Sequence, residues 1–326
     1  MAETISLKPA PRISVVMPVY NAGSHLLRAL RSILNQTWKD LEVLCVDDGS
    51  TDDSLKILQK LELTDRRIRI LSRPNTGIVG ALNDGVALAC GEFIARMDAD
   101  DFSLPQRFAA QIAFLEAHPE VVCLGCCALK VDADGDPIEI WRVPLTHEAI
   151  DAHHIKNASG GGIIHPTAML RRETLVKAGG YARGTDLAED LDLWLRLAET
   201  GRLANLEDVL LHYRVAATGL SVSRRVEQEH QTLRVLNAAR VRRNLPPLAA
   251  REPWLPSEEY QLRLNIISAR AEKFWRSARK FAWRLIRLRP SSKLGWLALI
   301  QSSFHLAFGG HDAKRRGTLC LDSEPR

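Results

Sequence analysis

The sequence predicts an α/β fold in which a mostly parallel sheet is flanked by helices and followed by a helical C-terminal extension. Short apolar runs alternate with helix-like segments over residues 1–125, the pattern of a parallel sheet with helices on both faces. Acidic clusters directly follow two of these runs. The chain of 326 residues is 46% apolar and 25% charged, which suffices for a large core and excludes disorder and small disulfide-stapled scaffolds.

The expected elements follow one another in regular order. Residues 13–17 form a β-branched run closed by Pro18, which is typical of a buried strand. Residues 23–36 then place apolar side chains at helical spacing. The further expected strands are 41–46, 68–71, 93–97 and 121–124, and the further expected helices are 54–61, 77–89, 105–118 and 188–200.

The charge of the chain divides it into two parts. Residues 1–223 hold 23 Lys and Arg against 30 Asp and Glu, whereas residues 224–326 hold 21 against 9. We therefore expect an acidic α/β domain over 1–223 and a basic helical extension over 224–326. Nucleic acid is not expected among the partners.

The cysteines and the N-terminus indicate a cytoplasmic protein. Several of the six cysteines lie inside apolar runs, where free thiols behave as small hydrophobic side chains. The single Cys-x-x-Cys at 123–126 has no second pair and no His at metal spacing, so we expect structural thiols. No signal peptide precedes residue 13, and no run has the roughly 20 apolar residues of a membrane-spanning helix.

The middle of the chain contains one predicted hairpin. Residues 131–140 read as two short strands that turn at Asp134-Gly135. A calcium-binding EF-hand is excluded, because the Gly comes too early and position twelve lacks a Glu.

The C-terminal extension carries a long apolar stripe. Apolar residues repeat at spacings of three and four from Leu264 to Leu288, which predicts one amphipathic helix of about seven turns. With Trp275 and Trp283 beside the basic residues, this helix suits an anionic membrane surface. The alternative is a stripe that packs on the protein and leaves the arginines in solvent. The basic residues off the stripe are Arg276, Arg279, Lys280, Arg284 and Arg287.

The acidic cluster at 98–101 is the strongest local candidate for a functional site. It follows an expected strand, and ligands of parallel sheets bind just outside the carboxyl ends of strands. Carboxylates this close repel one another unless a cation or hydrogen-bond donor neutralises them. A divalent ion held by one or two carboxylates and by substrate phosphates fits this pattern. A solvated acidic turn before the next helix is the alternative.

Three further segments are weaker candidates when each is taken alone. The cluster at 47–52 can be a strand-end turn with a helix N-cap. Residues 73–77 precede a helix, so Arg73 and backbone N–H groups could meet an anion. Glu189-Asp190 begins a helix, where the helix dipole alone stabilises acidic side chains; the alternative is that one carboxylate is a general base.

In combination these motifs resemble the family 2 glycosyltransferases of GT-A fold. The resemblance covers about residues 12–223 and includes the bacterial branch that builds surface polysaccharides. It rests on Pro18-Val-Tyr-Asn21, Asp47-Asp-Gly-Ser-Thr-Asp52, Asn75-Thr-Gly77, Asp98-Ala-Asp100, His165-Pro-Thr, Gly179-Gly-Tyr181, Glu189-Asp190 and Tyr213-Arg214.

The resemblance implies a role for each matching position. Pro18, Tyr20 and Asn21 would line the nucleotide of the donor, with Arg73 and Gly77 beside it. Asp48 would accept a hydrogen bond from the base, and Asp98 would hold the ribose side. Asp100 would hold Mn²⁺ or Mg²⁺ against the diphosphate. Asp190, accompanied by Glu189, would be the catalytic base.

The expected activity is an inverting, metal-dependent transfer of a sugar from a nucleotide-diphospho-sugar, a UDP-sugar first among them, to a hydroxyl acceptor. The acceptor would be a glycan or a lipid-linked glycan, and the basic extension would contact the inner face of the cytoplasmic membrane. A sugar nucleotidyltransferase is the first alternative, but residues 18–23 lack the Gly-rich basic loop that it needs. A non-catalytic nucleotide-sugar-binding protein is the second.

Overall fold

The computed structural model describes residues 10–157, 161–215, 224–250 and 256–308. The chain divides into two compact units. Unit 1 comprises residues 1–130 and 140–253, and unit 2 comprises residues 131–139 and 254–326. The division therefore falls later in the chain than the expected boundary after residue 223, and unit 2 also takes a segment from the middle of the sequence.

A nine-stranded mixed sheet forms the centre of unit 1. Its order is β3-β2-β1-β4-β8-β6-β9-β5, and β7 pairs with β6. The first four strands of this order are parallel, whereas β8 is antiparallel to both β4 and β6. The strands are β1 (Ile13–Val19), β2 (Leu41–Asp47), β3 (Ile68–Ser72), β4 (Phe93–Arg96), β5 (Phe102–Ser103), β6 (Val121–Val131), β7 (Pro137–Trp141), β8 (Met169–Arg171) and β9 (Arg202–Arg214).

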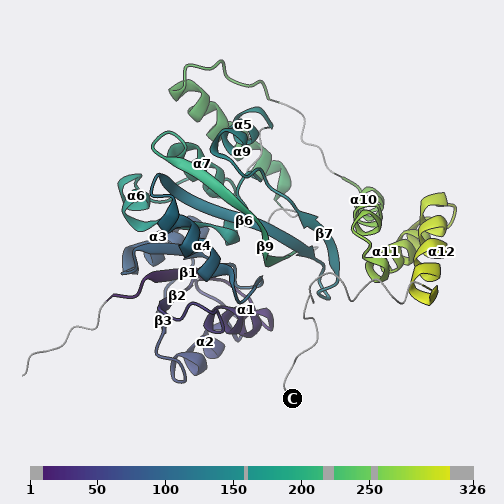
Figure 1. Cartoon of the computed structure of the whole chain (residues 1–326), viewed down its shortest axis with the longest axis horizontal. Helices are drawn as coiled ribbons and strands as arrows, with labels where there is room; N and C mark the ends of the chain where they lie inside the picture. Colours follow the sequence, from purple (N-terminus) through teal and green to yellow (C-terminus); the bar gives the residue numbers. More distant parts are fainter. Residues whose placement is uncertain (1–9, 158–160, 216–223, 251–255, 309–326) are drawn as a thin grey trace, which may run out of the picture. The chain divides into compact units, whose positions relative to one another are not determined.

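Helices cover both faces of this sheet (Figure 1). One core contains α1, α2 and α4, and the core on the other face contains α3, α6 and α7. Strand β1 explains the division, because Val15 belongs to the first core and Val16 to the second. The bounds are α1 (His25–Leu34), α2 (Ser54–Glu62), α3 (Ile78–Leu88), α4 (Arg107–Ala117), α5 (His147–Asn157), α6 (Arg172–Lys177), α7 (Glu189–Leu197) and α9 (Arg225–Arg242).

The predicted fold class and the predicted order of strands and helices are confirmed. Strands β1 and β2 are buried along their whole lengths, as expected for parallel strands covered on both faces. The five described cysteines are free, and Cys90 alone of these is exposed. No helix within the described ranges is long and apolar enough to cross a membrane.

Unit 2 joins the turn of the β6–β7 hairpin to three helices, α10 (Glu258–Ala271), α11 (Trp275–Leu288) and α12 (Lys293–Phe308). The hairpin turn at Asp134-Gly135 is confirmed, and Gly135 adopts a φ of 86° there. The prediction of one continuous helix is wrong, because the chain reverses at Lys273, whose φ is 61°. The reversal lets the two halves of the stripe pack on each other, with Ile266 and Phe281 in one core.

Two of the basic residues expected to face a membrane are paired within unit 2. The Lys280 ammonium lies 2.6 Å from Asp132, 2.6 Å from Asp134 and 2.7 Å from Asp136. Burial opposes the charge of Lys280, but the hydrogen bonds to three carboxylates raise its pKa. Arg284 lies 3.6 Å from Glu258. The expectation for Lys280 is therefore wrong, because its ammonium points into the hairpin turn.

Candidate active site

A cavity of about 790 Å³ opens in unit 1 beyond the carboxyl end of β4. Asp98 lines it from the loop after β4, and Glu189 and Asp190 line it from the first turn of α7. The chain brings these groups together because β4 ends and α7 begins at this edge of the sheet. Its size lies in the range of small-molecule sites.

The first turn of α7 carries two carboxylates with raised pKa values. Burial raises the pKa of Asp190 to about 6, against the opposing effect of the Leu191 N–H, which donates to Asp190 Oδ1 over 2.7 Å. Burial and the charge of Asp190 raise the pKa of Glu189 to about 7. A carboxylate with a pKa near neutrality is suited to accept a proton at physiological pH.

The turn from Asp98 to Asp101 concentrates negative charge beside the cavity. Asp98 forms an ion pair with Arg96. Burial and the charge of Asp98 raise the pKa of Asp100 to about 6, and burial likewise raises the pKa of Asp101. Asp101 is held from the other side by the backbone N–H of Arg214, which donates to Oδ1 over 2.8 Å.

The turn offers oxygen donors of the kind that Mn²⁺ and Mg²⁺ prefer. Asp100 is half-buried and forms no ion pair with a described residue, and Asp101 Oδ2 is buried without a hydrogen-bond donor in the described structure. One or two carboxylates together with substrate phosphates suffice for such an ion, so these residues fit it. The carboxylates of Asp132, Asp134 and Asp136 lie closer together than those of the Asp98 turn, but they already surround the ammonium of Lys280.

The segment after β1 forms an ordered turn against the loop at 50–54. Pro18 lies within β1, and Tyr20 follows with 55% of its surface exposed. Asn21 has a φ of 49°, which Asn tolerates better than most residues. Its Oδ1 accepts from the N–H of Thr51 over 2.8 Å. These contacts hold the backbone after Tyr20 at the sheet edge, where the Tyr20 ring is exposed.

Asp48 and Arg73 build the loop before α3. Asp48 Oδ1 accepts from Arg73 Nη2 over 2.8 Å, and its Oδ2 accepts from the N–H of Gly77 over 3.0 Å. The other terminal nitrogen of Arg73 donates to Asp84 over 2.6 Å. These contacts give Asp48 and Arg73 a structural task within the protein, in addition to any contact with a ligand.

The structure thus brings only part of the predicted site to the cavity wall. Asp98, Glu189 and Asp190 line it. The described part of the wall does not include the other predicted residues, which lie at the neighbouring strand ends. These are Pro18, Tyr20, Asn21, Asp48, Arg73, Gly77 and Asp100.

Several cavity residues were missed or had no assigned role in the sequence prediction. Arg96 lines the wall although it lies in a buried strand, and its charge within an apolar run was the available signal. Trp141 and Tyr213 contact edge to face at 5.4 Å between ring centroids. His165 donates to or accepts from the Tyr181 hydroxyl over 2.9 Å, and burial lowers its pKa well below the usual value.

Helix α9 forms the far wall of the cavity. Leu233 and Leu236 line it together with Leu187, Leu191 and Leu248. These leucines form an apolar strip on this side of the wall. Polar groups accompany these side chains, namely Lys156, Arg225, Gln228, Glu229, His230 and Thr232.

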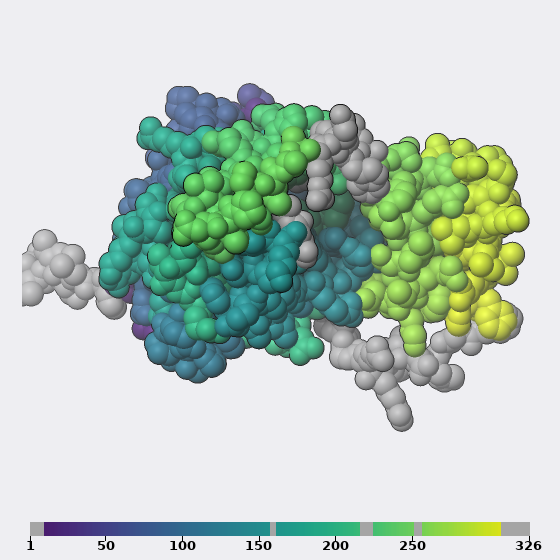
Figure 2. Space-filling view, turned by 90° about the horizontal axis from the view of Figure 1, so that it is seen from above, coloured from purple at the N-terminus to yellow at the C-terminus, as the bar shows by residue number. Residues whose placement is uncertain are grey.

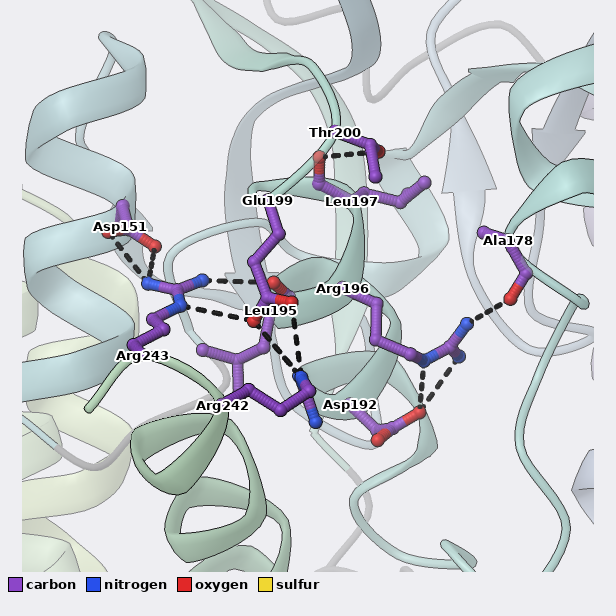
Figure 3. A network of polar contacts seen from close by, with 10 residues as sticks. All are labelled: Asp151, Ala178, Asp192, Leu195, Arg196, Leu197, Glu199, Thr200, Arg242 and Arg243. Atoms are coloured by element: carbon purple, nitrogen blue, oxygen red, sulfur yellow. Dashed lines mark hydrogen bonds and ion pairs between the residues drawn. The ribbon is translucent and has the colours of Figure 1, made fainter. Parts of the chain in front are cut away.

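An ion-pair network fixes the end of α9 against α5 and α7 (Figure 3). Arg243 lies 2.7 Å from Asp151 and 3.1 Å from Glu199, and it donates to the carbonyl of Leu195 over 2.9 Å. Arg242 also lies 3.0 Å from Glu199. In the space-filling view α9 is the green surface that lies over teal segments of unit 1 (Figure 2). Helix α9, and with it this part of the cavity wall, is thus attached to α7, the helix that carries Glu189 and Asp190.

Comparison with known proteins identifies related sequences. Residues 14–177 match the family model described as glycosyl transferase family 2. The putative glycosyltransferase EpsE of Bacillus subtilis is 34% identical over 213 residues, which cover 64% of this chain and 74% of that protein. The amylovoran biosynthesis glycosyltransferase AmsE of Erwinia amylovora is 33% identical over 209 residues, which cover 63% and 76%.

Solved structures show the same fold at lower identity. TarS of S. aureus in complex with UDP aligns with a TM-score of 0.57 at 18% identity, covering 89% of this chain and 88% of that one. The mannosyltransferase PcManGT of Pyrobaculum calidifontis, in complex with GDP-Man and Mn²⁺, aligns with a TM-score of 0.56 at 22% identity, covering 92% and 81%.

Proposed function

Because the chain belongs to glycosyl transferase family 2 and has the GT-A fold, we propose that this glycosyltransferase moves a sugar from a nucleotide-diphospho-sugar to a hydroxyl acceptor in one inverting step. The observation that carries the proposal is the shared cavity of Asp98 and the Glu189-Asp190 pair. A donor-side carboxylate and a separate basic carboxylate are the two groups that such a displacement needs.

Asp190 is the general base in this proposal. Its carboxylate lines the cavity, and the Leu191 N–H fixes one of its oxygens. The other carboxylate oxygen can accept the proton of the acceptor hydroxyl while the hydroxyl oxygen attacks the anomeric carbon. Burial and the charge of Asp98 keep the pKa of Asp190 high enough for proton transfer, and the charge of Asp190 in turn raises the pKa of Glu189.

Asp98 and Asp100 are the donor-side groups. A Mn²⁺ or Mg²⁺ ion held by Asp100 would stabilise the negative charge of the leaving nucleoside diphosphate. The exposed Tyr20 ring and the turn at Asn21 would lie along the nucleotide, and Asp48 would accept from its base. UDP-sugars and GDP-sugars are the donors to test first, since related folds were solved with UDP and with GDP-Man.

The acceptor enters beside α9 in this proposal. Leucines from α7 and α9 and Leu248 give that wall an apolar strip beside polar side chains of α9, a mixture that suits an amphipathic acceptor such as a lipid-linked glycan. One of the two relatives, AmsE, is named as a glycosyltransferase of amylovoran biosynthesis. An acceptor from cell-surface polysaccharide assembly is therefore the class that we propose.

We also propose that unit 2 contacts an anionic membrane, through α12 rather than through the stripe that packs inside the unit. Trp296, Leu297, Ile300 and Phe304 share one face of α12 and are 46–66% exposed. Exposed apolar stripes of this kind mark interaction surfaces. On α11, Arg276, Arg279 and Arg287 are exposed and form no ion pair with any described residue, so they complement anionic lipid.

A donor panel tests the proposed activity directly. The full chain is incubated with UDP- and GDP-sugars, with Mn²⁺, Mg²⁺ or a chelator, and release of UDP or GDP is measured. Release from one sugar that requires the metal and is lost in Asp190→Asn supports the proposal. Release of inorganic diphosphate in a parallel incubation with UTP or GTP and a sugar 1-phosphate would instead identify a nucleotidyltransferase, and binding without any turnover would identify a non-catalytic protein.

A further inference from the structure

Arg96 is the last residue of β4 and is fixed by its backbone on both sides. Its N–H donates to the carbonyl of Ala168 over 2.8 Å, and its carbonyl accepts from Arg107 Nη2 over 2.9 Å. The side chain is only 6% exposed but reaches the wall of the cavity. The sheet therefore fixes the backbone from which the buried guanidinium reaches the site.

Arg171, a partly buried arginine of the neighbouring strand β8, is bonded mainly by backbone carbonyls. Arg171 donates to the carbonyls of Val121 and Leu115 over 2.9 and 2.7 Å. Arg96 differs, because its Nε has no hydrogen-bond acceptor among the described residues and its one described ion pair is with Asp98. Burying a guanidinium is costly unless it is paired. The carboxylates around Arg96 must therefore compensate its charge, as the backbone carbonyls do for Arg171.

Those carboxylates come from two distant segments of the chain. Asp98 and Asp100 follow β4, whereas Glu189 and Asp190 begin α7. Burial raises the pKa values of Asp100, Glu189 and Asp190, and in each case the charge of Arg96 opposes that rise. Arg96, Asp98, Glu189 and Asp190 also line the same cavity, so the guanidinium lies within electrostatic range of both groups.

We propose that Arg96 is a positioning residue of the transfer site, a built-in cation that holds the Asp98 turn and the Glu189-Asp190 pair together before donor and metal bind. The proposal rests on the proposed function for the roles of Asp98 and Asp190. Without Arg96 the two acidic segments repel each other across the cavity. Arg96→Gln therefore separates the donor-side group from the base as well as removing a packed side chain.

A double-mutant cycle in metal-free buffer tests the coupling. Urea unfolding is measured for the wild type, Arg96→Gln, Asp190→Asn and the double variant at pH 7.5. The expected result is that Arg96→Gln destabilises much less when Asp190 is already neutral, with a coupling of about tenfold in the unfolding equilibrium constant. Arg171→Gln with Asp190→Asn is the matched control, and its effects should add because Arg171 is bonded to carbonyls.

A second measurement separates positioning from packing. Thermal unfolding is followed with and without Mn²⁺ alone for the wild type, Arg96→Gln and Arg96→Lys. Mn²⁺ should raise the melting temperature of Arg96→Gln more than that of the wild type, because the ion replaces the missing charge. Arg96→Lys keeps the charge and should behave as the wild type.

The two measurements give distinguishable outcomes. Additive effects of Arg96→Gln and Asp190→Asn would overturn the proposal, as would an equal response of all three proteins to Mn²⁺. If Mn²⁺ does not affect even the wild type, the metal in the proposed function is wrong, and the metal-free cycle alone decides the role of Arg96.

Discussion

Asp190 gives the first prediction at the scale of single residues. Asp190→Asn should lower kcat by roughly 10²–10⁴-fold, the usual effect of losing a general base. Donor affinity should barely change, because this carboxylate faces the acceptor. Steady-state kinetics with the donor found in the panel, together with calorimetry of UDP or GDP binding, check both parts. Weak nucleotide binding with normal turnover would show that the roles are reversed.

The same residues predict the acid limb of the pH profile. The Glu189 and Asp190 pKa values of about 7 and about 6 lie well above those of exposed carboxyl groups. The base is active only without its proton, so kcat/KM should fall as the pH drops through this range, rather than near pH 4. A profile measured from pH 4.5 to 8 checks this, and constant activity down to pH 5 would contradict it.

Asp100 gives the third prediction. Asp100→Asn should abolish turnover and weaken Mn²⁺-dependent binding of UDP or GDP by about 10²-fold, because the metal would lose a charged ligand. The fold should persist, since the side chain is only half-buried. Calorimetry with and without Mn²⁺ measures the loss. Asp65→Asn, which disrupts an ion pair with Arg67 outside the cavity, is the control.

At this scale the sequence located charged groups better than it located their partners. Asp98, Glu189 and Asp190 could be placed because their motifs in combination resemble family 2 glycosyltransferases, although each cluster alone has a structural alternative. Arg96 could not, since only the three-dimensional structure shows a guanidinium that lacks carbonyl partners. The leucines of α9 look like any packed helix until the cavity beside them is known.

At the scale of elements, the sequence predicted regular segments and missed a reversal. The strands and helices of unit 1 follow from periodicity, because each pattern is long enough to define a face. The stripe from Leu264 to Leu288 has helical spacing throughout, so nothing in its periodicity marks the break at Lys273. The break follows from packing, since two short helices can bury against each other the apolar side chains that one long helix would expose.

Helix α12 gives the element-scale prediction. Trp296→Ser with Ile300→Ser should strongly reduce sedimentation with vesicles of anionic phospholipid, because both side chains are exposed on one face. Arg276→Gln with Arg279→Gln and Arg287→Gln should reduce it mainly at low salt, where charges are least screened.

A matched control for this experiment lies in unit 1. Leu63 is 89% exposed, so Leu63→Ser removes an exposed apolar side chain without touching α12 and should leave sedimentation unchanged. A wild-type protein that does not sediment with anionic vesicles even at low salt would refute the membrane contact.

At the scale of the whole molecule, the two units have separate cores and should unfold separately. Lys280→Met leaves three carboxylates without their cation and should destabilise unit 2 by about 1–2 kcal/mol, because Asp134 and Asp136 remain partly solvated. Calorimetry should show one transition shifted and the other unchanged. Lys177→Met, which removes an exposed pair with Glu173, should shift neither. A single transition that moves as a whole would contradict the division.

The hairpin turn of unit 2 has a consequence for the order of events during synthesis. Asp136 leaves the ribosome 144 residues before Lys280, which is roughly 7–30 s at ordinary elongation rates of about 5–20 residues per second. Throughout that interval the sheet of unit 1 can form around β6 and β7, while the three aspartates between these strands have no ammonium. The nascent chain therefore displays an acidic loop whose negative charge is balanced by Lys280 only after α11 emerges.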